Sequence, residues 1–195
     1  YENLFYTFKD KYIVTASFAV DGSSRVGDNA ANTFKIAGTP FGFFYSAGLA
    51  WRLSSEPFLQ KYSWLDELKW RLSYGKTGND DIGESSASRY YKAIKFRETV
   101  GLYPAVITND ELTYEDVKQV NTGIDVSIWG SRISGTLDVF RSQTENMLIF
   151  SPVNAYLGFD FRMENSGKMK NTGWEASLFG RIKEGADFKW DARVF

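Results

Sequence analysis

Segments in which apolar and polar residues alternate recur along the whole chain. In residues 68–74, which read LKWRLSY, the two leucines, the tryptophan and the tyrosine share one face of an extended chain, and the lysine, arginine and serine share the other. The same alternation predicts strands at residues 5–8, 12–20, 43–53, 68–74, 124–128, 133–140, 174–182 and 188–194. A half-buried strand of a soluble protein and a strand of a membrane barrel share this pattern, so it leaves open what the apolar face touches.

The predicted connections alternate between short and long. Short turns fall at residues 9–11, at WGSR (129–132) and at KEGAD (183–187), and the stretch SSEPFLQKYSWLDE (54–67) predicts a helical turn or short connector. Long loops follow residues 20, 74 and 140; the second of these, 75–118, includes a possible hairpin at SRYYKAIKF, and the third spans 141–171. In an up-and-down sheet, every long loop then lies at one end. This asymmetry is typical of outer-membrane barrels, with short periplasmic turns and long extracellular loops, and nothing requires it in a β-sandwich.

Tryptophan positions add modest support for a membrane barrel. Trp51, Trp70 and Trp190 lie on the apolar face near short-turn ends, and Trp174 and Tyr74 lie near the long-loop end. Amphipathic rings of this kind form girdles at both membrane interfaces. The remaining turn tryptophan, in WGSR, has the opposite parity and does not fit this scheme.

Composition excludes several function classes. The chain has no cysteine and no histidine, so these 195 residues offer no disulfide, thiolate or imidazole metal site, and no triad with a histidine base. The formal net charge of −1 gives no basic footprint for nucleic acid. No apolar run is long enough for a transmembrane helix, and the first residues do not read as a signal peptide. We expect no enzyme activity and no cofactor.

Several ordered blocks together resemble a known family. They are FKDKYIVTASFAVDGSSRVGDN (8–29), AGLAWRLSSEPFL (47–59), WLDELKWRLSYGKTGNDDIG (64–83), LTYEDVKQVNTGIDVSIWGSRISGTLDVFRSQTENMLI (112–149) and ENSGKMKNTGWEASL (164–178). In this order and spacing they are similar to the C-terminal barrel region of the SusC/RagA family of TonB-dependent outer-membrane transporters, typical of Bacteroidetes. The family pattern NPDLKWE appears here as NDELTYE (109–115), without its proline.

The resemblance implies an all-β fold, in which residues 1–195 form about eight antiparallel strands of a larger, 22-stranded barrel. Members of the family carry an N-terminal plug domain inside the barrel and a TonB-box that couples to TonB–ExbB–ExbD; we expect neither plug nor TonB-box within this segment. They work with a SusD-like surface lipoprotein that captures a nutrient, usually an oligosaccharide and in some members a peptide. The implied function is active import across the bacterial outer membrane, with outer-membrane lipid as a further partner.

Two sets of residues are the candidates for contacts inside and above the barrel. Charged residues of the polar phase are expected to face the lumen and to pair across strands, with direct solute contact as the alternative: Arg52, Lys69, Arg71, Asp125, Asp138, Glu175, Arg181, Lys189, Asp191 and Arg193. Aromatic residues of the long loops are candidates for stacking on sugar rings or packing against the lipoprotein, with packing among loops as the alternative: Tyr90, Tyr91, Tyr103, Tyr156 and Phe159.

Three further motifs are weaker. YGKTG (74–78) lacks the first glycine of a phosphate loop and reads better as a strand-exit turn. GNDDIGE (78–84) could supply oxygen ligands to Ca²⁺ in an outer loop, although a solvated acidic turn is the simpler interpretation. Glu111, Glu115 and Asp116 carry the carboxylates that glycosidase chemistry uses, but without a predicted pocket we read them as capping or exposed charges.

Two other classes of protein remain as alternatives. The first is a complete small eight-stranded barrel without transport function, which the small residues of the polar phase, such as Gly48 and Ala50, would underfill. The second is a soluble β-sandwich that binds carbohydrate, which would need no detergent for extraction. Because an open sheet in lipid leaves two unpaired edges, we expect the isolated segment not to form a stable soluble monomer.

Overall fold

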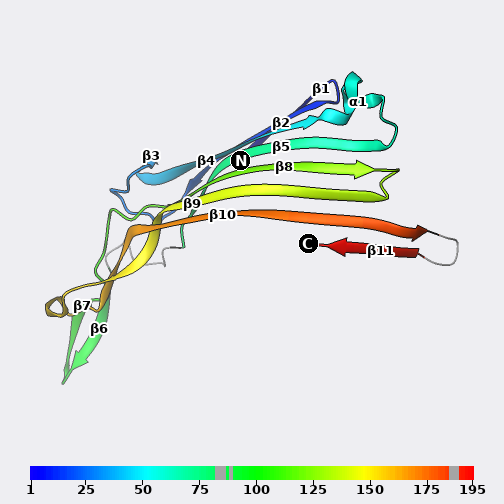
Figure 1. The fold of residues 1–195 in the computed structure, drawn as a ribbon. Helices are drawn as coiled ribbons and strands as arrows, with labels where there is room; N and C mark the ends of the chain where they lie inside the picture. Colours follow the sequence, from blue (N-terminus) through cyan, green and yellow to red (C-terminus); the bar gives the residue numbers. More distant parts are fainter. Residues whose placement is uncertain (82–86, 88–89, 185–188) are drawn as a thin grey trace.

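One large antiparallel sheet dominates the computed structural model, which describes residues 1–81, 87, 90–184 and 189–195. Its main path runs β1–β2–β4–β5–β8–β9–β10–β11, the short β3 pairs with β4, and β6–β7 forms a separate hairpin (Figure 1). The strands are β1 (Glu2–Phe8), β2 (Tyr12–Gly22), β3 (Phe34–Ile36), β4 (Thr39–Arg52), β5 (Leu65–Asn79), β6 (Tyr91–Phe96), β7 (Thr99–Pro104), β8 (Glu115–Ile128), β9 (Ile133–Pro152), β10 (Phe161–Glu184) and β11 (Lys189–Val194). The remaining elements are η1 (Leu53–Ser55), α1 (Pro57–Gln60) and η2 (Ala155–Leu157), and no helix in the described residues is long and apolar enough to cross a membrane.

The register of the sheet places like residues beside each other. Leu49 pairs with Leu72 across β4 and β5, and Ile124 pairs with Leu137 across β8 and β9. Because side chains alternate between faces, a shift of one residue would send every apolar side chain to the other side, so the alternating sequence specifies this register strongly. The result is an apolar face, which carries these four residues and Leu178, and a polar face on the opposite side.

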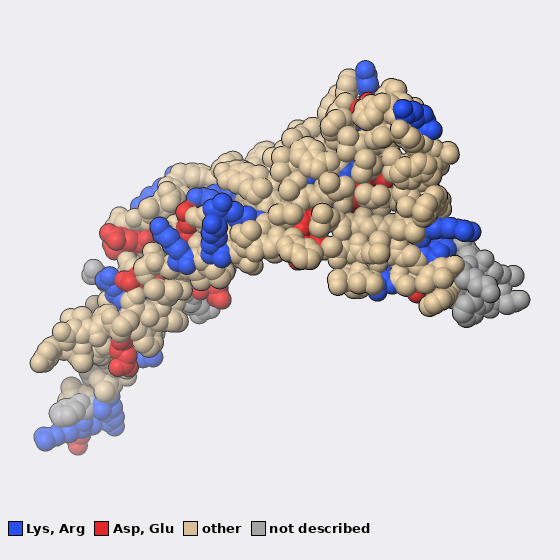
Figure 2. Space-filling model, viewed as in Figure 1, with Lys and Arg blue, Asp and Glu red and all other residues tan. Residues whose placement is uncertain are grey.

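No second layer of the described chain covers the apolar face. Leu137 is 48% exposed and Leu178 is 55% exposed, although both lie in the middle of long strands. In a β-sandwich, side chains at such positions would interdigitate with a second sheet. Figure 2 shows a central region in which few charged side chains reach the surface, with charges gathered toward both ends. The apolar face therefore needs a partner from outside these residues.

The two ends of the sheet differ as the sequence predicts. At one end, strands are joined by the turns at residues 9–11 and 129–132 and by the connector that contains η1 and α1. Lys9 and Asp10 both have φ of 52°, and Trp129, Gly130 and Ser131 also have positive φ, so these turns are tight. At the other end lie β3, the β6–β7 hairpin and the long loops (Figure 1). We call these the short-turn end and the long-loop end.

The sequence predicts a third long loop over residues 141–171, and this prediction is wrong for most of the segment. The strand β9 continues to Pro152 and β10 begins at Phe161. Residues 141–145 and 169–171 belong to the main sheet, and residues 146–152 and 161–167 form a two-stranded ribbon that extends beyond it. Both faces of the ribbon carry polar residues, which removes the alternation that reveals a strand. Register shifts on either side of Gly167 also interrupt its period. The strand β5 likewise runs on to Asn79, so residues 74–78 are strand rather than a strand-exit turn.

The buried core of the described chain lies at the long-loop end and not within the sheet. Val26, Leu112 and Tyr114 are at most 4% exposed, and Phe44 packs edge-to-face on Tyr114 at a centroid distance of 5.4 Å. The Tyr114 hydroxyl donates a hydrogen bond of 3.0 Å to the backbone oxygen of Asp21. This loop junction therefore anchors the segments 21–33 and 109–115 to the end of β4.

Backbone hydrogen bonds join the two segments directly. The Gly27 amide donates to the Leu112 oxygen at 2.7 Å, and the Asn29 amide donates to the Asp110 oxygen at 2.8 Å. A Cβ atom at Gly27 would lie 2.1 Å from the Asp110 oxygen, so only glycine allows this approach. Asn165 of β10 adds a clip, because its side chain accepts from the Thr113 amide and donates to the Thr113 and Asn146 oxygens.

A second junction forms at the short-turn end around Glu56, between η1 and α1. Its carboxylate accepts hydrogen bonds from Lys11 Nζ (3.0 Å), Tyr12 Oη (3.0 Å) and Trp51 Nε1 (3.1 Å). The Lys11 bond, followed by those from Trp51 and Tyr12, holds the pKa of Glu56 below its ordinary value. The connector is thus tied to the ends of β2 and β4.

Substitution Gly27→Ala should open the loop junction, because the new methyl group cannot coexist with the Asp110 backbone. We expect a local loss of about 1–3 kcal/mol, seen as faster hydrogen exchange and protease cleavage in residues 23–33 and 105–114 of the full-length protein. The control is Gly180→Ala, where a Cβ meets nothing within 4 Å. Equal exchange in both variants would show that the junction does not depend on this approach.

Acid should weaken the Glu56 junction. Because the folded pKa of Glu56 is lowered, its contribution is complete above the unfolded pKa and is lost as the pH falls through the folded pKa. We therefore expect the full-length barrel to lose thermal stability between about pH 6 and pH 3, and the Glu56→Gln variant to lose less over the same range. An identical pH profile for both proteins would contradict this assignment.

Candidate functional site

A network of four charged side chains, with Glu67 at its margin 3.4 Å from Lys69, crosses three strands on the polar face. Arg71 of β5 donates from Nε to Asp125 Oδ2 at 2.9 Å and from Nη2 to Asp125 Oδ1 at 2.8 Å. The same Nη2 lies 2.9 Å from Asp138 Oδ1 on β9, and Lys69 Nζ lies 2.9 Å from Asp125 Oδ2. A bidentate arginine that also reaches a second carboxylate fixes the spacing of β5, β8 and β9.

Gly123 makes room for this network. It pairs in register with Arg71 on one side and Asp138 on the other. A Cβ atom there would lie 2.2 Å from Asp138 Oδ1 and 2.9 Å from Arg71 Nη2. The absent side chain lets the guanidinium pass over β8 to the carboxylate two strands away.

The other predicted lumen-facing charges are not part of this network. Arg52 donates to the Asp10 backbone oxygen at 3.3 Å, Arg181 lies 3.9 Å from Asp191, and Arg193 stacks over Phe179 at 5.5 Å. Within the described residues, Glu175 forms no hydrogen bond or ion pair. The side chain of Lys189 lies outside the described part. The polar face thus carries one tight cluster of charges and several dispersed ones.

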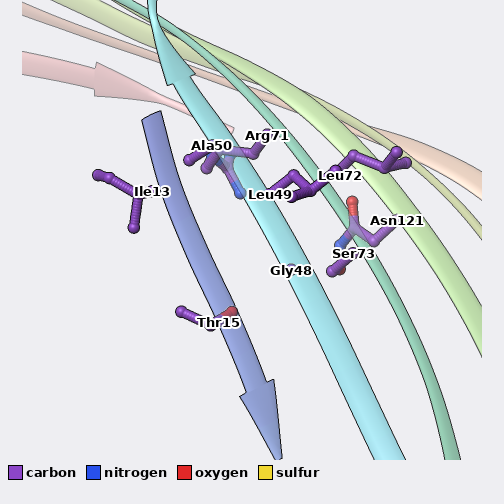
Figure 3. A pocket seen from close by; sticks show the side chains of 9 residues that line it. All are labelled: Ile13, Thr15, Gly48, Leu49, Ala50, Arg71, Leu72, Ser73 and Asn121. Atoms are coloured by element: carbon purple, nitrogen blue, oxygen red, sulfur yellow. The ribbon is translucent and has the colours of Figure 1, made fainter. Parts of the chain in front are cut away.

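A shallow hollow lies beside the network on the polar face. It has a volume of about 200 Å³, and Thr15 of β2, Gly48 of β4, Ser73 of β5 and Asn121 of β8 line it with Arg71 at one side (Figure 3). A second hollow of about 330 Å³ shares the first four of these residues. The Oδ1 atom of Asn121 is buried without a hydrogen-bond partner among the described residues. Small uncharged residues here leave space over the sheet.

The aromatic candidates do not converge on one site. Tyr91 and Tyr103 are 58% and 43% exposed and lie on opposite faces of the β6–β7 hairpin, as its register shows. Tyr156, in η2 at the tip of the β9–β10 ribbon, is 98% exposed, whereas Tyr90 and Phe159 are half-buried. The structure therefore presents exposed aromatic residues at two separate places, the base of the β6–β7 hairpin and the tip of the ribbon, rather than a single aromatic platform.

The acidic candidates are occupied by structural contacts. Glu115 accepts from the Asn79 side chain at 2.9 Å and from the Leu148 amide at 2.8 Å, and Asp116 pairs with Lys76 at 2.8 Å. Glu111 is exposed in a turn next to the loop junction. Residues 82–84 of the proposed Ca²⁺ segment lie outside the described part, and the described residues hold no cluster of acidic side chains suited to a metal.

Sequence reasoning missed the clip at Asn165 and the junction at Gly27. The asparagine lies directly before the first of two register shifts, where no periodicity marks it. A signal for this junction was present in the sequence, because the three ordered blocks that meet there all carry the family resemblance: residues 8–29, 112–149 and 164–178.

Substitution Arg71→Gln should destabilise the wall, because Asp138 loses its cation and Asp125 keeps only Lys69. All four side chains are partly exposed, so we expect a modest loss of about 1–2 kcal/mol, measured by urea unfolding of the full-length barrel in lipid vesicles. The matched control is Glu175→Gln, which removes a charge from the same face without breaking an ion pair; because Glu175 lies directly opposite Asp138, this change relieves repulsion and should cost no stability. An equal loss of unfolding free energy in the two variants would show that the charged network does not stabilise the wall.

The chain is similar to bacterial receptors along almost its whole length. Residues 4–195 match the family model described as TonB dependent receptor-like, beta-barrel. The chain is 32% identical to TonB-dependent receptor P39 of Formosa agariphila over 97% of its residues, and 29% identical to TonB-dependent receptor SusC of Bacteroides thetaiotaomicron over 95%. It spans 18% of the length of each.

Solved structures of the RagAB peptide importer superimpose on the same region. The closed-closed state gives a TM-score of 0.86 and the open-open state 0.84, each at 30% identity, covering 98% of this chain and 20% of the matched chain. These likenesses confirm the predicted antiparallel barrel segment and its resemblance to SusC and RagA. They also imply a location in the bacterial outer membrane. This chain belongs to the TonB-dependent receptor β-barrel family.

Proposed function

We propose that these residues form part of the wall of a TonB-dependent transporter that imports a nutrient across the bacterial outer membrane. The observation that carries the proposal is the contrast between the two faces of one sheet. Leucines in mid-strand are half exposed on the apolar face, and a network of paired charges lies on the opposite face. Lipid suits the first face, and the water-filled or plugged interior of a wide barrel suits the second.

The open edges of the sheet support a larger barrel. The strands β1 and β11 each pair with one neighbour among the described residues. In hydrocarbon an unpaired edge would leave a row of backbone groups without hydrogen bonds. Further strands of a longer chain would satisfy them, and this chain spans only a fifth of the length of its relatives.

Oligosaccharide is our first choice of cargo, and peptide is the alternative. The resemblance to SusC favours the first, and the structural likeness to a peptide importer favours the second. A SusD-like lipoprotein is the proposed partner at the long-loop end, where the exposed Tyr91, at the base of the β6–β7 hairpin, and Tyr156, at the tip of the ribbon, are available for contact. Energy would arrive through TonB–ExbB–ExbD acting on a part of the protein outside these residues.

Cysteine labelling of the full-length protein tests the orientation. We expect Tyr156→Cys, at the long-loop end, to react with an impermeant maleimide on intact cells. Lys61→Cys, just after α1 at the short-turn end, should react only after the outer membrane is permeabilised. Labelling of Lys61→Cys on intact cells with protection of Tyr156→Cys would reverse the proposed orientation.

Uptake by a deletion strain tests the transport function and its cargo. Cells lacking the gene should lose growth on the cargo class, whether oligosaccharide or peptide, and the intact gene should restore it. Restoration should also fail when the TonB gene is deleted. Normal uptake of both classes in the deletion strain would refute the function.

A further inference from the structure

A row of basic residues crosses four neighbouring strands where the apolar face ends at the long-loop end. Lys76 of β5 pairs in register with Lys118 of β8, Lys118 pairs with Gln143 of β9, and Gln143 pairs with Lys170 of β10. These positions have the same parity as the apolar residues below them, so their side chains lie on the apolar face. Like charges directly opposite each other destabilise a sheet, so the Lys76–Lys118 pair needs counter-ions.

Two more cations extend the row. Arg141 of β9 has the same parity and pairs with Thr172 of β10, one step closer to the apolar residues. Lys168 lies within the register shift between Gly167 and Met169. We call Lys76, Lys118, Arg141, Lys168 and Lys170 the basic row.

Carboxylates neutralise only part of the basic row. Asp116 pairs with Lys76 and Glu145 pairs with Lys118. The other three cations, Arg141, Lys168 and Lys170, are exposed, and none has a hydrogen bond or ion pair within the described residues. Arg141 and Lys170 therefore stand without a counter-ion on strands β9 and β10, and Lys168 interacts only at longer range with Glu145, which Lys118 already pairs.

The height of the row above the short-turn end matches the edge of a membrane. From Ile133 to Arg141, eight steps of about 3.4 Å give about 27 Å along the strand. A strand tilt of roughly 40° reduces this to about 21 Å, close to the apolar band of about 25 Å in outer-membrane barrels. Trp174 lies directly beneath Arg141, since it pairs with Val139. Along the sheet toward the long-loop end, the Trp174 ring therefore comes first and the Arg141 cation next, which is the order found at a lipid–water interface.

We propose that the basic row binds the phosphate groups of a phosphorylated glycolipid, the lipid A part of lipopolysaccharide, in the outer leaflet. The site continues the lipid-facing surface without a break, so its occupant is a molecule whose acyl chains lie on that surface. Exposed lysine and arginine at a membrane surface attract anionic headgroups. This inference rests on the proposed function for one fact, the extracellular position of the long-loop end.

The clustering of charge distinguishes this row from the rest of the long-loop end. The β6–β7 hairpin also carries exposed lysines, Lys92 and Lys95, but it forms a separate sheet away from the apolar face. A lipid whose acyl chains lie on the apolar face cannot place its headgroup against the hairpin lysines at the same time. These lysines therefore provide a matched set for a control variant, together with the exposed Lys35 of β3.

The test measures glycolipid binding to the full-length protein in detergent and in nanodiscs. The variant combines Arg141→Gln, Lys168→Gln and Lys170→Gln, and the control combines Lys35→Gln, Lys92→Gln and Lys95→Gln. Native mass spectrometry counts co-purified lipid A, and titration gives its affinity. We expect the variant to bind lipid A about 10- to 100-fold more weakly and the control to bind like the unmodified protein.

Further arms of the test identify the ligand. Dephosphorylated lipid A should bind the unmodified protein as weakly as lipid A binds the variant, and inorganic phosphate should not compete at millimolar concentration. Equal binding of both lipids, full competition by phosphate, or unchanged binding by the variant would each overturn the proposal. So would loss of the lipoprotein partner, rather than of lipid, in the variant.

The two proposals fail in different ways. If the cysteine at Tyr156 labels from outside and lipid A binding is unchanged in the variant, only the glycolipid site is refuted. If the labelling pattern is reversed, the orientation in the proposed function is refuted, whatever the lipid binding shows.

Discussion

The need of every backbone amide for a hydrogen-bond partner governs this structure. In hydrocarbon, water cannot provide that partner, so strands must pair on both sides and a sheet must close on itself. The long strands β5, β8, β9 and β10 meet this need along their shared lengths. With the backbone satisfied, the side chains are free to differ between faces, and a sheet of single thickness can separate lipid from a polar interior.

The polar elements of the structure reinforce this thin wall where packing cannot. A soluble sheet gains stability from a second layer, which the described residues lack. Here Arg71 holds carboxylates on two other strands, and Gly123 provides the clearance. The small buried core lies at the loop junction, where Leu112 is fully buried. Among the described residues, the sheet itself has almost no buried side chains. Stability is therefore concentrated at the two ends and at one charged network.

The strands within the apolar band could be predicted from the sequence because lipid-facing and interior-facing residues differ most there. The prediction failed where both faces meet water. Residues 141–171 show no alternation, yet β9 and β10 stay paired for most of that length. Parity places Arg71 and Asp125 on the same face of the sheet, but the reach of Arg71 to Asp138 depends on Gly123, whose role only the register reveals. The loop junction joins segments more than 80 residues apart, and no local pattern encodes such a contact.

The clip at Asn165 has a consequence for how such a protein can diversify. It fastens the bases of the outer loops to one another, while the hairpin β6–β7 and the turn around Tyr156 project beyond the fastened region. Mutations at these projections leave the fastening untouched, so evolution can exchange tip sequences as modules. Under the proposed transport function, a new cargo preference can then arise without any change to the strands of the wall.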